Sequence, residues 1–141
     1  MKKIFISSDH AGFKLKEKIK HYLANKKLKF VDLGPKDDNR VDYPDYAHKV
    51  AKKVKLNNRN FGILVCGSGT GMNIAANKHK NVRAAQCFNL KSTKLSRLHN
   101  DANIITLGSR LISKKYGLRF IGVFLNTKFD GGRHLKRIKK I

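Results

Sequence analysis

Residues 61–77 read FGILVCGSGTGMNIAAN, and this stretch decides how the rest of the chain is interpreted. Its mostly apolar first five residues predict a short buried strand. Three glycines alternating with hydroxyl residues come after Cys66 and predict a tight turn, and a helix-compatible pattern resumes at Met72. Cys66 is therefore expected at the carboxyl end of a strand, where a glycine-rich loop enters a helix. Open α/β sheets bind their ligands at such positions.

The loop after Cys66 offers two chemical functions. Its closely spaced glycines let backbone N–H groups approach an anion, and the start of a helix adds a positive partial charge. The same field stabilises a thiolate on Cys66. The alternative is an ordinary turn beside an inert core cysteine, because free cysteine is common in protein cores. The segment alone leaves both interpretations open.

Two nucleotide-binding motifs do not fit this loop. The dinucleotide fingerprint needs its third glycine one position beyond Gly71, and no acidic residue between Gly71 and Asn100 is present to hold a ribose hydroxyl. A phosphate-binding P-loop needs Gly-Lys-Ser or Gly-Lys-Thr after the glycines, and neither occurs.

Composition predicts one globular domain over residues 1–141, since 40% of the residues are hydrophobic. No apolar run approaches the roughly 18 residues of a membrane span, and the apolar run near the N-terminus is too short for a signal peptide. The two cysteines, Cys66 and Cys87, form no metal-binding or disulfide pattern. We therefore expect a cytoplasmic protein.

The net charge of +23 has several possible meanings. It raises the expectation of nucleic acid, anionic membranes or phosphorylated substrates as partners. However, lysines are spread along the whole chain, as a general bias toward lysine would also produce. No nucleic-acid-binding motif occurs, and no basic stripe alternates with aromatic residues. Charge alone does not select a function.

Strand and helix patterns alternate along the chain. Strands are expected at 2–8, 28–33, 61–65, 82–87 and 102–107, and helices at 11–24, 42–56, 72–77, 90–98 and 109–125, the last capped by Ser109; residues 130–141 form a basic C-terminal helix. This alternation predicts an α/β fold: a three-layer α/β/α sandwich with a five-stranded parallel sheet, Rossmann-like.

Parallel strands place the loops at their carboxyl ends on one shared edge of the sheet. The segments Asp9–His10, Cys66–Gly71, Cys87–Asn89 and Gly108–Arg110 all come directly after predicted strands. The edge thus gathers a carboxylate, an imidazole, a thiol, several backbone N–H groups and an arginine. Such a set suits proton transfer beside an anionic group.

Seven short motifs occur in order over nearly the whole chain: SDHAG at 8–12, DYP at 42–44, CGSGTG at 66–71, AANK at 75–78, HNDAN at 99–103, GSR at 108–110 and GGRH at 131–134. Together they resemble the type B ribose-5-phosphate isomerases. As a set they are far more specific than the glycine loop alone.

The resemblance implies a reaction and its central residues. The family interconverts ribose 5-phosphate and ribulose 5-phosphate, a step of the pentose phosphate pathway, through an enediolate. Cys66 resembles the base that takes the proton from the carbon next to the carbonyl. The loop N–H groups would hold the enediolate oxygen, and the residues concerned are Gly67, Ser68, Gly69, Thr70 and Gly71. Ser68 stands where threonine is frequent in the family, which keeps the hydroxyl.

The resemblance also implies how the sugar is held. His99 would open the furanose ring, while Asn100 and Asp9 would bind sugar oxygens. A surface histidine at a helix end is the alternative for His99, and the surrounding HNDAN string favours the role in ring opening. His21, His48 and His79 lack motif neighbours and are interpreted as surface residues, and Cys87 as a core residue.

The phosphate is assigned by resemblance to Arg133 and Arg137, with Arg110 and His10 assisting. Positions 133 and 137 are one helical turn apart, so both guanidinium groups can reach one dianion. A solvated basic tail is the alternative interpretation of this segment.

No cofactor and no metal are expected. A metal-dependent hydride shift needs clustered ligands, and the 9 acidic residues form no spaced ligand motif. The resemblance implies a homodimer or a dimer of dimers, in which His99 and Asn100 face the partner's site. Allose or galactose 6-phosphate is an alternative substrate, and nucleic-acid binding is a less favoured alternative function.

Overall fold

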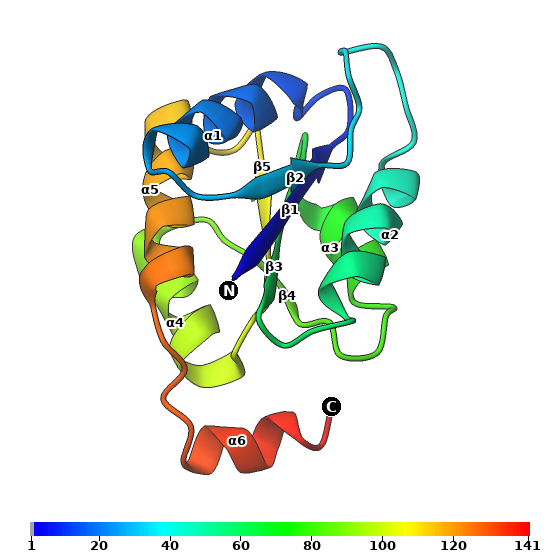
Figure 1. The fold of residues 1–141 in the computed structure, drawn as a ribbon. Helices are drawn as coiled ribbons and strands as arrows, with labels where there is room; N and C mark the ends of the chain where they lie inside the picture. Colours follow the sequence, from blue (N-terminus) through cyan, green and yellow to red (C-terminus); the bar gives the residue numbers. More distant parts are fainter. Residues whose placement is uncertain (1) are drawn as a thin grey trace.

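The structure, a computed structural model, describes residues 2–141, in which strands and helices alternate (Figure 1). The strands are β1 (Lys3–Ser8), β2 (Phe30–Asp32), β3 (Asn60–Cys66), β4 (Ala84–Gln86) and β5 (Ile104–Gly108). The helices are α1 (Phe13–Asn25), α2 (Tyr43–Val54), α3 (Thr70–Ala76), α4 (Leu90–Asn100), α5 (Lys114–Asn126) and α6 (Arg133–Ile138). The predicted α/β fold is confirmed.

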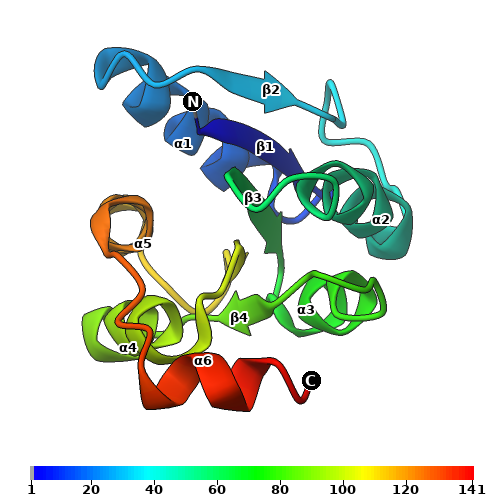
Figure 2. The ribbon, with the colours of Figure 1, turned by 60° about the horizontal axis from the view of Figure 1, so that its bottom comes forward.

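All strand pairs are parallel, in the order β2-β1-β3-β5-β4. Helices α1, α4 and α5 cover one face of the sheet, and α2 and α3 cover the other (Figures 1 and 2). The chain therefore forms the expected three-layer, Rossmann-like sandwich. The register pairs Ser8 with Val65 and Cys66 with Gly108, so the carboxyl ends of β1, β3 and β5 lie next to one another.

The central strand β3 is buried along its whole length and contributes to both cores. Because successive side chains of a strand point to opposite faces, Ile63 and Val65 pack on the α1 and α5 side, whereas Leu64 and Cys66 pack on the α2 and α3 side. This placement explains why the residues of the strand are mostly apolar on both of its faces.

Several element boundaries differ from the predicted ones. The prediction that Ser109 caps the helix after β5 is wrong, because the Ser109 Oγ instead donates a hydrogen bond to the Ala11 carbonyl oxygen at 2.8 Å. Helix α5 begins four residues later than that cap implied, with Ser113 accepting a hydrogen bond from the Tyr116 N–H. Helix α3 begins at Thr70, so part of the glycine loop lies in its first turn.

The outer strand β4 forms two hydrogen bonds with a side chain. The Asn77 Oδ1 accepts from the Ala84 N–H at 2.8 Å, and its Nδ2 donates to the Ala84 carbonyl oxygen at 3.0 Å. Asn77 comes directly after α3, so these bonds fix the end of that helix to the sheet edge.

Helix α6 is short, basic and without a buried residue. It lies at the lower end of the molecule in Figure 1 and beside α4 in Figure 2. The predicted C-terminal helix is thus present, in a shorter form. Within residues 2–141, no helix combines the length and the apolar character needed to cross a membrane.

Candidate active site

A cavity of about 380 Å³ opens at the carboxyl ends of β1, β3 and β5. Its lining includes many of the residues that the sequence predicted to share this edge. The lining residues are Asp9, His10, Ala11, Tyr43, Cys66, Gly67, Ser68, Gly71, Arg110 and Leu111. Of the predicted edge segments, only Cys87–Asn89 does not line this cavity. It follows β4 at the same edge, but Phe88 and Asn89 line a neighbouring apolar groove that shares Leu111 with the cavity.

Cys66 ends the central strand and is 4% exposed. Its Sγ accepts a hydrogen bond from the Gly69 N–H at 3.1 Å. Gly69 reaches this position with φ of +79°, a left-handed conformation that favours glycine, and a Cβ there would lie 3.0 Å from the Leu107 carbonyl carbon. This contact holds the sulfur inside the glycine loop, next to the backbone N–H groups of that loop.

The other thiol has a different environment. Cys87 is 1% exposed and lies in the core, as predicted. Desolvation by burial raises the pKa of its thiol, which keeps the group protonated and unreactive.

The loop after Cys66 has unused backbone donors close to the thiol. The Thr70 N–H donates to the Ser68 Oγ at 3.2 Å, and the Gly69 N–H is taken by the sulfur. The N–H groups of Gly67 and Ser68 have no hydrogen-bond acceptor within residues 2–141. These two groups are free to donate to an anionic oxygen beside the thiol.

Gln86 fixes the conformation of this loop from the neighbouring strand β4. Its Nε2 donates to the Ser68 carbonyl oxygen at 2.7 Å and to the Thr70 Oγ1 at 3.0 Å. No role for Gln86 is predicted from the sequence. Its partners are 16 and 18 positions away in the chain, and no local pattern signals the contact.

Asp9 and His10 are held in place by backbone contacts. The Asp9 N–H donates to the Val65 carbonyl oxygen at 3.1 Å, and the Asp9 carboxylate accepts from the Gly12 N–H at 2.9 Å. The His10 Nδ1 accepts from the Val41 N–H at 3.3 Å, so the proton of the neutral ring resides on Nε2. The carboxylate is thereby placed at the end of the strand next to that of Cys66.

Arg110 and Tyr43 close the cavity over two of the glycines. A Cβ on Gly67 would lie 2.9 Å from the Arg110 Nη1, and a Cβ on Gly71 would lie 2.5 Å from the Tyr43 ring. A larger residue at either position would therefore force the Arg110 or Tyr43 side chain to move. Tyr43 belongs to one of the seven sequence motifs, but no function is predicted for it from the sequence.

The remaining predicted site residues lie at the opposite end of the sheet. His99 and Asn100 end α4, just before the amino end of β5, and Arg133 and Arg137 lie on α6. Figure 1 shows α6 and the last turn of α4 at the lower end of the molecule. The length of β5 separates them from Cys66, a distance of about 16 Å for five residues. One chain therefore carries two separate groups of predicted site residues.

Charged side chains fix the end of α4. The Arg97 Nη1 donates to the Asp101 carboxylate at 2.7 Å and to the Ala102 carbonyl oxygen at 2.6 Å. The Arg83 guanidinium donates to the Asn100 carbonyl oxygen at 3.0 Å and to the Asp101 carboxylate at 3.2 Å. Asp101, for which the sequence predicts no role, thus holds the turn that presents His99 and Asn100.

His99 stacks on His134, with ring centroids 4.2 Å apart and an angle of 14° between the rings. Desolvation, together with the charges of His99, Arg133 and Arg137, lowers the pKa of His134. Asp130 completes a group whose nitrogen and oxygen atoms all lie within 4.8 Å of one another. Folding thus brings together three potential metal ligands that show no ligand motif in the sequence.

The cavity at the carboxyl end of the sheet combines a thiol, free backbone N–H groups, a carboxylate and an arginine. This combination suits an enzyme that moves a proton beside a developing oxyanion, as isomerases of sugar phosphates do. Comparison with known families agrees with this class. Residues 4–141 match the family described as Ribose/Galactose Isomerase. The chain belongs to this family, and its resemblance to the type B ribose-5-phosphate isomerases is confirmed.

Similar proteins match over almost their whole length. Ribose-5-phosphate isomerase B of Escherichia coli is 40% identical over 141 residues, which cover 100% of this chain and 95% of that protein. The structure of a ribose 5-phosphate isomerase from Thermotoga maritima is 49% identical with a TM-score of 0.95, covering 98% of this chain and 95% of that one. The structure of Ribose-5-phosphate Isomerase B from Mycoplasma genitalium with bound ribulose-5-phosphate is 45% identical with a TM-score of 0.95, covering 98% and 92%.

Proposed function

We propose that this isomerase interconverts D-ribose 5-phosphate and D-ribulose 5-phosphate through an enediolate. The observation that carries the proposal is the Cys66 Sγ beside two free N–H donors, those of Gly67 and Ser68. The relative that was solved with ribulose-5-phosphate supports the choice of sugar.

Ring opening is the first step of the proposed reaction. His99 accepts the proton of the anomeric hydroxyl and returns it to the ring oxygen as the bond between that oxygen and C1 breaks. An imidazole can do both near neutral pH because its unperturbed pKa is about 6.5. The open-chain aldehyde is the product of this step.

Proton transfer at the thiolate is the second step. Cys66 removes the hydrogen from C2 as a proton, the electron pair forms a C1–C2 double bond, and O1 becomes negatively charged. The Gly67 and Ser68 N–H groups donate to O1; donors of this kind typically contribute about 3 kcal/mol each to the transition state. The thiol then returns the proton to C1 while the O2 proton passes to O1, which yields the ketose.

The sugar and its phosphate are held by the remaining predicted residues. Asp9 and Asn100 bind hydroxyl groups, and Arg133 and Arg137 bind the phosphate dianion with help from His10 and Arg110. The chain's net charge of +23 favours capture of an anionic substrate by long-range attraction.

The proposed site combines residues from two copies of the chain. His99 and Arg133 lie about 16 Å or more from Cys66 in one chain, whereas proton transfer needs contact with a single small sugar. In a homodimer, the end of α4 and α6 of one copy would complete the cavity of the other. A dimer of dimers keeps the same arrangement.

The second candidate function is isomerisation of a 6-phosphate sugar, either galactose or allose. The description of the matched family, which includes galactose, favours keeping this candidate. The nucleic-acid alternative rests on net charge alone.

Turnover of ribose 5-phosphate in the presence of a chelator tests the proposal. Cys66→Ala should lower kcat by roughly a thousandfold, the scale of a lost general base, without changing the circular dichroism spectrum. Cys87→Ala removes the other thiol and should keep its activity. Near-normal turnover by Cys66→Ala would exclude Cys66 as the base. Higher kcat/KM on allose or galactose 6-phosphate would favour the second candidate.

A further inference from the structure

We propose that His99, Asp130 and His134 bind a divalent transition metal ion such as Zn²⁺, and that the bound ion inhibits the enzyme. The inhibitory part rests on the proposed role of His99 in ring opening. Metal binding itself does not depend on that role.

The three side chains offer a suitable ligand set. Imidazole nitrogen and carboxylate oxygen are the ligands that Zn²⁺, Ni²⁺ and Cu²⁺ take in proteins, and two histidines with one carboxylate leave a coordination position open. Their ligand atoms lie within 4.8 Å of one another. Within residues 2–141, no other group of three such side chains is as close together.

The backbone holds this group together. The Asp130 N–H donates to the Leu98 carbonyl oxygen at 3.1 Å, which fixes the loop before α6 to the last turn of α4. The His134 N–H donates to the Gly131 carbonyl oxygen at 3.0 Å, which sets the first turn of α6. These two hydrogen bonds hold Asp130 and His134 close to His99.

Binding requires a small adjustment of the side chains. Ligand atoms around a tetrahedral Zn²⁺ at about 2.0 Å lie about 3.3 Å apart, so the separations within the group must shorten by at most about 1.5 Å. The nearly parallel rings of His99 and His134 must also tilt so that their lone pairs converge. Asp130 is exposed and lies outside any helix, so its carboxylate can move toward the rings.

Inhibition is a consequence of the shared histidine. A nitrogen lone pair of His99 that coordinates a metal ion cannot accept a hydroxyl proton. The ion therefore blocks ring opening, and a chelator restores it.

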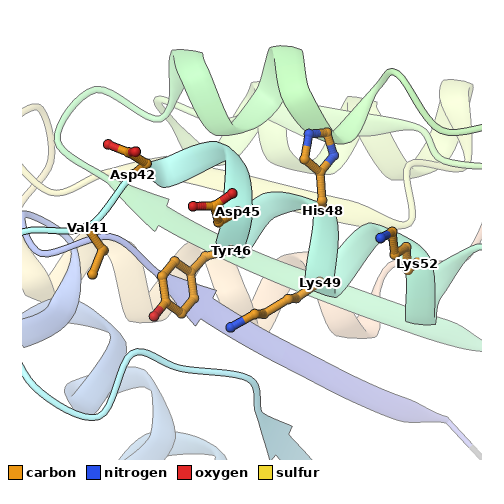
Figure 3. Close-up of a pocket in the computed structure, with 7 residues that line it drawn as sticks. All are labelled: Val41, Asp42, Asp45, Tyr46, His48, Lys49 and Lys52. Atoms are coloured by element: carbon orange, nitrogen blue, oxygen red, sulfur yellow. The ribbon is translucent and has the colours of Figure 1, made fainter.

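A second histidine pair provides a matched control. The His48 Nδ1 lies 2.8 Å from the His79 Nε2, which joins α2 to the turn after α3. Figure 3 shows the hollow on α2 that His48 lines, with Asp42 and Asp45 set apart from the ring and Tyr46 and Lys49 pointing to the other side. Among the residues that the structure describes, this pair therefore lacks a third ligand.

Titration of the metal-free, full-length protein with Co²⁺ tests binding without an activity measurement. We expect visible absorption bands of a low-symmetry Co²⁺ site with one ion per chain, and no near-ultraviolet band of thiolate ligation. Asp130→Asn and His134→Ala should each weaken binding at least tenfold, whereas the double variant His48→Ala/His79→Ala should bind like the wild type. Absence of the bands, a thiolate band, or unchanged binding in His134→Ala would overturn the proposal.

Zn²⁺ inhibition tests the consequence for turnover. Asp130→Asn, which keeps the backbone contact, should raise the Zn²⁺ concentration for half-inhibition at least tenfold, and His48→Ala should leave it unchanged. Equal inhibition of wild type and Asp130→Asn would overturn the inhibitory role. If Co²⁺ binds as expected but ribose 5-phosphate is not turned over, the metal site stands and the proposed reaction fails.

Discussion

Two adjacent serines on β1 are both fully buried but differ in their hydrogen bonds. The Ser7 Oγ donates to the Tyr46 carbonyl oxygen at 3.0 Å. The Ser8 Oγ has no partner within residues 2–141, although it lies directly before Asp9 of the cavity. An unpaired buried hydroxyl costs free energy that a paired one does not.

Substitution of the two serines should therefore have different effects on stability. Ser7→Ala should lower the free energy of unfolding by about 1 kcal/mol, because the Tyr46 carbonyl loses its donor. Ser8→Ala should leave the free energy of unfolding unchanged or raise it by up to about 1 kcal/mol. Urea unfolding of both variants measures the difference, and equal losses would show that Ser8 has a hydrogen-bond partner after all.

At the scale of elements, the loop between β3 and α3 depends on the neighbouring strand β4. Gln86 is the residue through which β4 acts, because it binds the loop at Ser68 and Thr70. The loop that Gln86 binds also carries the free N–H groups of Gly67 and Ser68 and fixes their orientation. Loss of this support should thus affect the transition state more than the bound substrate.

Gln86→Met keeps the length of the side chain and removes its hydrogen bonds. We expect kcat on ribose 5-phosphate to fall about three- to tenfold, the equivalent of one net hydrogen bond, with a smaller change in KM. Steady-state kinetics measures this split, and circular dichroism checks the fold. A raised KM with unchanged kcat would assign Gln86 to substrate binding instead.

Features that depend on local pattern and on parallel topology were predicted well from the sequence. The gathering of Asp9, His10, Cys66 and Arg110 at one edge was foreseeable because parallel strands end on the same side. Contacts between distant segments were not foreseeable. Ser109 fits a helix cap by pattern, and only its bond to Ala11, 98 positions away, decides against it.

A single sequence motif can contain both candidate site residues and residues that only hold the backbone in place, and the structure distinguishes the two. Within HNDAN, His99 and Asn100 are presented to the surroundings, whereas Asp101 and Asn103 hold the turn; their partners are Arg97, Arg83 and Asn81. The Arg97–Asp101 pair has the i, i+4 spacing of neighbours on a helix. The contacts that Arg83 and Asn81 make with this turn follow no spacing rule, because they depend on the fold. The same holds for the approach of Asp130 and His134 to His99.

At the scale of the whole molecule, each chain carries two groups of predicted site residues at opposite ends of its sheet. The cavity contains the thiol, and the surface formed by α4 and α6 contains the predicted ring-opening histidine. In a symmetric dimer, one two-fold operation completes both sites together. Activity should then require the cavity of one chain together with the α4 and α6 surface of another.

Mixed dimers test this dependence. Cys66→Ala and His99→Asn should each be nearly inactive alone, but random refolding of an equal mixture should regain about a quarter of wild-type activity, because half of the symmetric dimers contain one intact site of two. A mixture of Cys66→Ala with Cys66→Ser should regain none. Activity no greater than the sum of the separate variants would show that each site is built from one chain.

The two hydrogen bonds between Asn77 and Ala84 also affect how the protein behaves at high concentration. Outer strands are the places where sheets of different molecules join and start to aggregate. On β4, the N–H and carbonyl groups of Ala84 are already occupied by the amide of Asn77. With only three residues in the strand, little unpaired backbone is left for an incoming chain. The side chain that fastens α3 to the sheet thus also protects this edge against intermolecular strand addition.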